Sequence, residues 1–408
     1  MITKTFDKYH VVNSPRNKKL FGVFLIILLI IIYIIVALIL PPPKIKATES
    51  SIQAPTANTP AISWPKDQQE AIGASGFGVL ATDGEQKSAP IASIAKTMLA
   101  LAVIKQKPLS TGKQGPTITI TSKDVELFNT YFAQNGSVVP VELNEQLTEY
   151  QILQALLLPS GDNIADTLAN WAFGSVDNYL TYANNLAKDL NLEQTHFADA
   201  SGLSPQTVSS AQDLVILGEN IMAEEVLAEI VNQSKVTLPV VGQVGNYNTL
   251  LGQENIVGIK TGNTDEAGGC FLFAIKNKIN EKDVTLIGVI LGATNRNQAL
   301  ADTKKFLQNN VKNFQFVKVA EAGQVIGTFN TPWGKSGNVV AEKDLDFLLV
   351  NNQKPDLKIS FDQILPPQNK GAKVGTATVT SGMAQASINL ILDNKISKPP
   401  FFWKIFHP

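Results

Sequence analysis

The feature that most constrains this chain is an apolar run near its N-terminus. Residues Leu20 to Leu40 read LFGVFLIILLIIIYIIVALIL and contain no charged side chain. A helix of that length rises about 30 Å, the thickness of the hydrocarbon core of a bilayer. A cleaved signal peptide usually has a shorter apolar region, of about 7–15 residues, which ends in a small-x-small site. Because this run is longer and continues into Pro41, Pro42 and Pro43, we expect an uncleaved transmembrane anchor at 20–40.

The charges that flank the run predict its orientation. Only Lys44 and Lys46 follow it closely, whereas the preceding segment contains one acidic residue, Asp7, and the basic residues Lys4, Lys8, Arg16, Lys18 and Lys19. Cytoplasmic flanks are enriched in Lys and Arg. We therefore expect a cytoplasmic tail at 1–19 and an outer part that begins after the anchor. Residues 41–63 are rich in Pro, Ser, Thr and Ala, and we expect them to form an extended linker.

Length and composition limit the chemistry of the outer part. The chain has 408 residues, enough for two compact domains besides the anchor. Its net charge of -1 does not suggest a nucleic-acid partner. A single cysteine, Cys270, excludes an intrachain disulfide and a cysteine zinc site. Of the three histidines only His196 lies far from the chain ends, so imidazole chemistry is scarce. We expect neither a metal nor a cofactor, and we interpret His196 as structural.

The order of predicted elements indicates two outer domains. Residues 64–314 combine helices with apolar strands; the strands are expected at 76–85, 255–262, 268–277 and 284–292, and the helices within 90–106, 148–161, 163–173, 176–190, 210–231 and 297–314. Pro90 is expected at the start of the first helix, and Thr148 with Gln151 forms a capping box. This order predicts an α+β domain with an antiparallel sheet.

Residues 315–408 have a different texture, with short strands between Gly, Pro and Asn turns. They predict a small all-β domain. It ends in an aromatic tail, KPPFFWKIFHP, which is short and broken by proline. We expect no amphipathic helix there and expect the tail to pack on the β-domain.

Ser93 and Lys96 are the first candidates for catalysis. A serine hydroxyl needs a neighbouring base, and no serine here lies in a G-x-S-x-G turn. The i, i+3 spacing places Lys96 beside Ser93 on one helix face. Apolar neighbours and the helix N-terminus disfavour the charge of the lysine and so favour its action as a base. Taken alone, the pattern is also typical of an ordinary helix start.

Two further motifs follow along the chain. Ser160-Gly161-Asp162-Asn163 comes after an apolar helix, and an ordinary turn with a helix cap would have the same residues. Lys260-Thr261-Gly262 ends an apolar strand. The glycine permits close approach of a ligand, and Lys260 with Thr261 can hold a carboxylate, although a plain strand end explains the pattern as well.

The three motifs together, in this order and with these separations, resemble the D-alanyl-D-alanine carboxypeptidases among the low-molecular-mass penicillin-binding proteins. Further stretches that are similar to this family are PIASIAKTMLALAVI, EQLTEYQILQALLLPSGDNIADTLA, LEQTHFADASGL and IVGIKTGNTDEAGGCFLFA. The resemblance implies a β-lactamase/transpeptidase-like domain followed by a small β-domain. It also implies a bacterial membrane protein whose catalytic domain lies outside the cytoplasm, with peptidoglycan stem peptides as substrates and β-lactam antibiotics as inhibitors.

The resemblance implies a role for each motif residue. Ser93 would attack the terminal D-Ala-D-Ala bond and form an acyl-enzyme, with Lys96 as its base. Ser160 would pass a proton to the leaving D-alanine. The backbone N–H groups of Ser93 and Asn263 would form the oxyanion hole. The substrate carboxylate would bind to Lys260 and Thr261, beside Gly262.

One departure from the family pattern concerns the second motif. The family usually has Ser-x-Asn, but here Asp162 stands in the third position and Asn163 follows. In one alternative, Asp162 replaces the asparagine directly and stabilises the charged form of Lys96, which would make this lysine a poorer base. Alternatively the loop shifts by one residue, so that Asn163 enters the cleft and Asp162 caps the next helix. We prefer the shift, because it gives the acid a use without weakening the base.

Two other functions compete with a carboxypeptidase. A β-lactamase would need a glutamate that activates water for deacylation, and no clear Glu-x-x-x-Asn segment follows Asp162; Glu193 is the nearest candidate. A catalytically idle penicillin-binding or wall-binding protein is favoured only by the altered second motif.

Overall fold

The computed structural model describes residues 15–50, 52, 56 and 60–407. The first element is helix α1 (Pro15–Ile39), which contains the expected anchor. Lys19–Ile39 is the one helix among the described residues that is long and apolar enough to cross a membrane. Its side chains are almost all exposed, as expected for a helix that is covered by lipid. Most of the predicted cytoplasmic tail lies outside the described residues.

A five-stranded antiparallel sheet organises the larger outer unit. Its order is β10 (Ile256–Thr264), β11 (Gly268–Ile279), β12 (Lys282–Ala293), β2 (Gln69–Ala74) and β3 (Gly78–Asp83). The α+β prediction and its four strands are confirmed. β2 was not predicted from the sequence. Its segment, QEAIGA, is polar at one end and nevertheless fully buried between β12 and β3.

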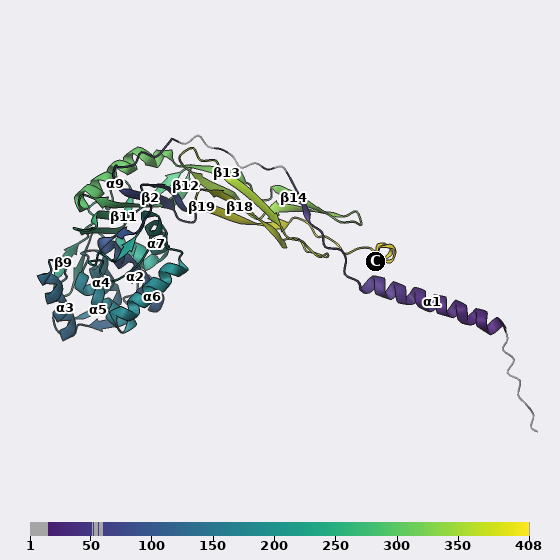
Figure 1. Ribbon diagram of the computed structural model, residues 1–408, viewed down its shortest axis with the longest axis horizontal. Helices are drawn as coiled ribbons and strands as arrows, with labels where there is room; N and C mark the ends of the chain where they lie inside the picture. Colours follow the sequence, from purple (N-terminus) through teal and green to yellow (C-terminus); the bar gives the residue numbers. More distant parts are fainter. Residues whose placement is uncertain (1–14, 51, 53–55, 57–59, 408) are drawn as a thin grey trace, which may run out of the picture.

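Helices cover both faces of this sheet, which explains why β11 and β12 are apolar on both sides. Helix α9 (Arg296–Asn310) packs on one face and α7 (Ala211–Ala223) on the other. Beyond α7 lies a helical cluster (Figure 1) made of α2 (Ala95–Gln106), α3 (Ser122–Ala133), α4 (Glu149–Leu157), α5 (Asp162–Phe173), α6 (Val176–Asp189) and α8 (Glu225–Val231).

Helix α2 is the centre of this cluster. Its side chains from Ala95 to Ile104 are all buried, as the apolar sequence predicted. The predicted helix start at Pro90 is wrong, because Ala89–Pro90 forms the short strand β4, which pairs with β7 (Val208–Ser209). A 3-10 turn, Ala92–Ile94, then leads into α2. The capping box of Thr148 with Gln151 at the start of α4 is confirmed.

The smaller outer unit is built from strands, as the sequence predicted. Its main sheet has six strands, in the order β1 (Ala47–Glu49), β14 (Val325–Asn330), β15 (Ser336–Ala341), β19 (Ala384–Leu392), β18 (Lys373–Ser381) and β17 (Asp356–Phe361). A separate pair consists of β13 (Gln315–Ala320) and β16 (Leu345–Leu349).

The linker is bound more closely to this unit than its composition suggested. β1 belongs to residues 41–63 and pairs antiparallel with β14. Ile45 and Ile62, near the two ends of the linker, are buried. The extended conformation of β1 is therefore stabilised by a sheet edge, a tertiary contact that its sequence does not reveal.

The expectation for the C-terminal tail needs a correction, because Phe401–Phe406 forms a short helix, α10. Trp403 packs edge-on against Trp333 of the β-domain, with ring centroids 5.2 Å apart. The tail also contacts the outer end of α1: the Tyr33 hydroxyl donates to the Ile405 carbonyl at 2.7 Å, and Lys404 Nζ donates to the Leu38 carbonyl at 2.8 Å. In Figure 1 the C-terminus lies beside the end of α1 that leads into the linker, and the start of α1 lies a full helix length away.

Candidate active site

Ser93 and Lys96 meet at the start of α2. Ser93 lies in the 3-10 turn, and Lys96 is the second residue of the helix. The lysine side chain is fully buried, and its Nζ donates to Ser93 Oγ at 2.8 Å. Gly262 lies against this turn, because a Cβ atom there would come within 3.1 Å of the Ser93 backbone nitrogen. The first and third motifs are thus in direct contact.

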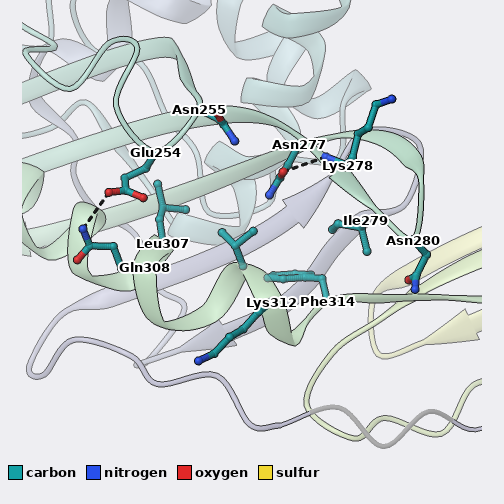
Figure 2. Close-up of a pocket in the computed structure, with 11 residues that line it drawn as sticks. Glu254, Asn255, Asn277, Lys278, Ile279, Asn280, Leu307, Gln308, Lys312 and Phe314 are labelled. Atoms are coloured by element: carbon teal, nitrogen blue, oxygen red, sulfur yellow. Dashed lines mark hydrogen bonds between the residues drawn. The ribbon is translucent and has the colours of Figure 1, made fainter.

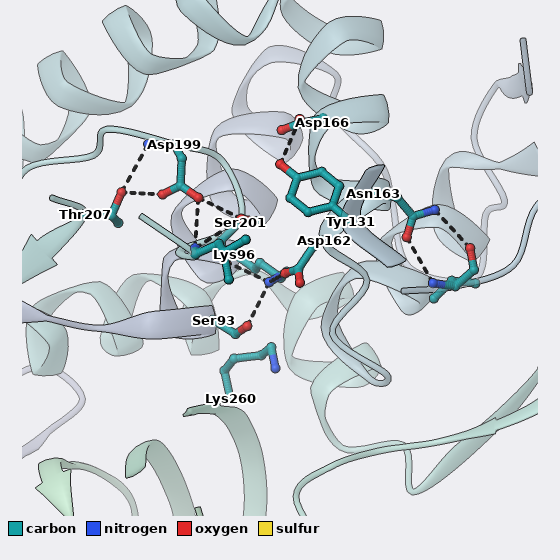
Figure 3. Close-up of polar contacts among 12 residues, drawn as sticks. Ser93, Lys96, Tyr131, Asp162, Asn163, Asp166, Asp199, Ser201, Thr207 and Lys260 are labelled. Atoms are coloured by element: carbon teal, nitrogen blue, oxygen red, sulfur yellow. Dashed lines mark hydrogen bonds and ion pairs between the residues drawn. The ribbon is translucent and has the colours of Figure 1, made fainter. Parts of the chain in front are cut away.

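Lys96 has two further partners. Its Nζ donates to Asp162 Oδ1 at 2.6 Å and to the Ser201 carbonyl at 2.7 Å (Figure 3). Three acceptors around one Nζ match the three N–H groups of an ammonium. In this arrangement the lysine is the donor toward Ser93. It must lose a proton before it can accept the proton of the serine.

The second motif differs from our preferred expectation. Asp162 enters the site, whereas Asn163 points to the neighbouring segment: its Oδ1 accepts from the Val139 N–H at 3.0 Å, and its Nδ2 donates to the Val139 carbonyl at 2.9 Å. Asp162 does not cap α5, because Gly161 occupies the N-cap position. The loop has not shifted. Asp162 is the first residue of the helix, and Asn163, about 100° further round, faces away from the lysine.

Ser160 completes the second motif with a hydroxyl that faces no partner. Its side chain is buried, and among the described residues no hydrogen bond to its Oγ is found. Its φ of +66° is unusual for a residue other than glycine, so the turn holds this serine in a strained conformation. A buried hydroxyl without a partner is costly, and a bound substrate would remove this cost.

The third motif lies on β10, the edge strand of the sheet. Lys260 and Thr261 are buried, and Lys260 Nζ donates to the Thr261 carbonyl at 3.0 Å. Burial, together with the charges of Lys96 and Arg296 and against the opposing charge of Asp162, lowers the pKa of Lys260 well below the usual lysine value. Figure 3 shows Lys260 on the opposite side of Ser93 from Lys96. A negatively charged ligand group beside Lys260 would therefore stabilise the charged form of this lysine.

Known proteins were compared with this chain. A sequence profile of the family described as D-alanyl-D-alanine carboxypeptidase matches residues 71–295, more than half of the chain. The chain belongs to this family. It is 26% identical to the D-alanyl-D-alanine carboxypeptidase DacA of Haemophilus influenzae over 285 residues, which cover 67% of this chain and 71% of that protein. It is also 26% identical to DacA of Escherichia coli K12 over 326 residues, which cover 77% and 79%.

Solved structures show the same fold. Penicillin-binding protein 5 from Haemophilus influenzae superposes with a TM-score of 0.65 at 22% identity, over 86% of this chain and 99% of that one. A Streptococcus pneumoniae protein, described as the peptidoglycan synthesis regulatory factor PBP3, gives a TM-score of 0.65 at 19% identity, over 85% and 100%. The predicted transpeptidase-like domain with a following β-domain is therefore confirmed as a fold.

The group that faces Lys96 is the Asp162 carboxylate, at the position where the family resemblance led us to expect an asparagine amide. Two more carboxylates lie nearby, those of Asp166 and Asp199 (Figure 3). Tyr131 donates to Asp166 Oδ2 at 2.9 Å. Burial raises the pKa of Asp166 to about 6, with smaller contributions from Asp199 and Asp162 and against the hydrogen bond from Tyr131.

Asp199 organises the loop that carries the third partner of Lys96. Its carboxylate accepts from Ser201 Oγ at 2.7 Å and from the Leu203 N–H at 2.9 Å. Between them lies Gly202, whose φ is +81°; a Cβ atom there would come within 1.9 Å of the Ala92 carbonyl. The backbone of this loop therefore packs in direct contact with the turn that carries Ser93. Asp199 and Gly202 lie in the family-like stretch LEQTHFADASGL, but outside the three motifs, so neither was selected as a site residue from the sequence.

Arg296 is a second residue that the sequence did not single out. It follows the N-cap of α9, and its backbone N–H donates to Asn263 Oδ1 at 2.8 Å. The sequence signal was an arginine three residues after the end of β12, which becomes informative only when β12 is known to lie two strands from β10. His196, by contrast, is exposed and only forms a backbone bridge with Val208.

A separate cavity of about 520 Å³ lies away from these motifs (Figure 2). It is found between the Ile279 end of β11 and the last turn of α9, and side-chain amides and lysines such as Asn277 and Lys278 line it. None of the predicted site residues contributes to it. The catalytic motifs are therefore brought together elsewhere, at the other end of β11.

The orientation of Asn163 leads to a prediction about stability. Asn163→Ala should lower the free energy of unfolding by about 2–4 kcal/mol, because two hydrogen bonds are lost and the buried Val139 groups are left unpaired. Acylation of the protein that remains folded should stay within a few-fold of wild type. Urea denaturation and penicillin labelling would measure the two effects.

The matched control is Asn178→Ala, which removes an exposed asparagine bonded to the Phe173 carbonyl at 3.0 Å. It should change stability by less than about 1 kcal/mol. An Asn163→Ala protein with wild-type stability and abolished acylation would contradict the orientation described here.

Proposed function

We propose that the outer part of this chain is a serine-type D-alanyl-D-alanine carboxypeptidase that acts through an acyl-enzyme on Ser93. The observation that supports this most strongly is the contact between Ser93 Oγ and the fully buried Lys96 Nζ at 2.8 Å, with Lys260 on the other side of Ser93 (Figure 3). The nucleophile and its base come from the start of α2, and the cation for the substrate carboxylate comes from β10. Membership of the carboxypeptidase family supports the same activity.

The first chemical step is acylation. Lys96, as a neutral amine, accepts the Ser93 proton while Ser93 Oγ bonds to the carbonyl carbon of the penultimate D-alanine. The oxyanion that forms is stabilised by the backbone N–H groups of Ser93 and Asn263, a type of interaction worth about 10²–10³ in rate per donor in other hydrolases. The amide bond to the terminal D-alanine then breaks. Ser160, whose hydroxyl is free of other partners, passes a proton to the departing amine.

Deacylation completes the cycle. A water molecule attacks the acyl-enzyme, its proton returns through Lys96, and the peptide shortened by one D-alanine leaves with its new carboxyl group. A penicillin would acylate Ser93 by the same attack, on the carbonyl carbon of its lactam ring, and the ring-opened product would stay attached. Both substrates therefore compete for one serine.

The terminal carboxylate of the substrate selects where the peptide is cut. Lys260 and Thr261 lie on β10 next to the serine turn, and the Arg296 guanidinium lies near enough to influence the pKa of Lys260. We assign these three side chains to carboxylate binding. A peptide with a free C-terminus brings a carboxylate that can bind to these donors.

Membrane attachment is part of this proposal. Helix α1 would span the cytoplasmic membrane of a bacterium once, and the flanking lysines place the catalytic unit outside. There the enzyme would meet the stem peptides of the peptidoglycan. The β-domain, with β1 added to its sheet, would act as a spacer between membrane and active site.

One observation favours a second function, a penicillin-binding protein without turnover. The 2.6 Å ion pair between Lys96 and Asp162 stabilises the charged lysine, which cannot act as a base. Release of D-alanine from a peptide would distinguish the enzyme from the idle protein. An active enzyme releases D-alanine despite this ion pair, whereas an idle protein releases none at any pH.

A stable adduct should identify the nucleophile. We expect incubation of the full chain with benzylpenicillin to add one penicilloyl group to Ser93, detected by mass spectrometry of the tryptic peptides. Ser93→Ala should abolish the adduct. Ser160→Ala should form the adduct more slowly than wild type, but should still form it because the attacking Ser93 oxygen is retained. A label on another serine would overturn the assignment.

The pKa of Lys260 predicts a pH dependence of substrate capture. Because that pKa is lowered, the ammonium loses its proton at lower pH than a free lysine, so kcat/KM should fall as pH rises through the lowered value. In Lys260→Arg the guanidinium keeps its charge. Dividing the kcat/KM of wild type by that of Lys260→Arg cancels the contribution of Lys96, which both proteins share. This ratio should fall toward alkaline pH.

Lys260→Ala is the companion variant. It should raise KM and lower kcat for D-Ala-D-Ala peptides most strongly below the lowered pKa, where the wild-type lysine is charged, and the difference from wild type should shrink above it. A flat ratio between wild type and Lys260→Arg, together with wild-type kinetics in Lys260→Ala, would remove Lys260 from the carboxylate site.

A further inference from the structure

Tyr247 lies between the second and third motifs, in the turn that connects β9 (Gly242–Gly245) to β10. Its backbone N–H donates to the Leu158 carbonyl at 3.2 Å, two residues before Ser160. Its ring faces the Arg296 guanidinium, whose Cζ lies 4.6 Å from the ring centroid. The tyrosine therefore contacts both the segment that leads into the second motif and the arginine beside the third.

Arg296 itself is fixed at its backbone but not at its charged end. The hydrogen bond from its N–H to Asn263 Oδ1 holds the main chain against the third motif. Within the described part of the chain, no carboxylate forms an ion pair with the guanidinium. The stacking contact with Tyr247 is thus the interaction that limits where this guanidinium can lie.

The turn that carries Tyr247 is well ordered by its own hydrogen bonds. Asn246 Oδ1 accepts from the Asn248 N–H at 2.8 Å, and Asn246 Nδ2 donates to the Gln233 carbonyl at 3.0 Å. Asn248 is buried, and its Oδ1 accepts from the Leu250 N–H at 3.2 Å. The ring is therefore presented from a rigid support, which lowers the entropy lost when Arg296 is held in place.

We propose that Tyr247 is a positioning residue that holds the Arg296 guanidinium at the carboxylate end of the cleft, and so favours peptides with a free C-terminal carboxylate. This rests on the proposed function. A guanidinium stacks flat on an aromatic ring, which satisfies its face and leaves its N–H edge free. That edge is the part that binds a carboxylate with two parallel hydrogen bonds. Tyr247 acts on the substrate through Arg296.

The ring, rather than the hydroxyl, carries this role. Among the described residues no hydrogen bond is assigned to the Tyr247 hydroxyl, and the side chain is partly exposed. Tyr247→Phe should therefore resemble wild type, whereas Tyr247→Leu should raise KM for a D-Ala-D-Ala peptide about two- to fivefold, the worth of an exposed cation–π contact. The kcat should change less than KM, because no reacting atom touches the ring.

A double-mutant cycle on the full chain in detergent tests the proposal. Steady-state hydrolysis of a peptide ending in D-Ala-D-Ala is measured for wild type, Tyr247→Leu, Arg296→Leu and the double variant. If Tyr247 acts through Arg296, Tyr247→Leu has no further effect on KM once Arg296 is replaced. Phe402→Leu, in the distant helix α10, is the matched control for loss of an exposed aromatic ring.

The outcomes separate this inference from the proposed function. Equal effects of Tyr247→Leu in both backgrounds, or an equal rise of KM in Tyr247→Phe, would overturn the positioning role while hydrolysis by wild type still supports the carboxypeptidase. Absence of D-alanine release from wild type, with Ser93 intact, would instead contradict the proposed function.

Discussion

The position of Lys96 is the constraint on which the rest of the site depends. An ammonium that is fully removed from water is expensive, and it persists only where acceptors replace its hydration. Ser93, Asp162 and Ser201 supply those acceptors at 2.6–2.8 Å, from three separate segments. Each segment is therefore held in place partly by the lysine, and loss of one partner would leave a buried charge incompletely paired.

The fold supplies the rigidity that such close contacts need. Helix α2 is buried on every side and fixes the lysine backbone. The loop at Gly202 and the strand at Gly262 then approach the Ser93 turn so closely that no side chain fits between them. Because β10 is an edge strand, no further strand of this sheet pairs with its outer side, the kind of edge on which proteins can bind an extended peptide.

Local patterns predicted much of this fold, and tertiary contacts account for the rest. The sequence predicted several elements correctly: the apolar strands β10, β11 and β12, the buried helix α2 and the capping box at Thr148. These could be predicted because each depends on residues that are close in sequence. The helical phase that sends Asp162 rather than Asn163 toward Lys96 depends on where α5 begins, and the sequence left this open. The roles of β1 and Arg296 depend on strands far away in the chain, because β1 pairs with β14 and the Arg296 N–H donates to Asn263 on β10.

The most direct test of this account is the rate of acylation by a fluorescent penicillin at neutral pH, compared between wild type and Asp162→Asn. The Asp162 carboxylate accepts from Lys96 Nζ at 2.6 Å and so favours the ammonium, which cannot accept the Ser93 proton. Replacing the carboxylate with an amide should therefore make acylation faster. An unchanged or slower rate in a folded Asp162→Asn protein would contradict the assignment of Lys96 and Asp162 as the pair that controls the nucleophile.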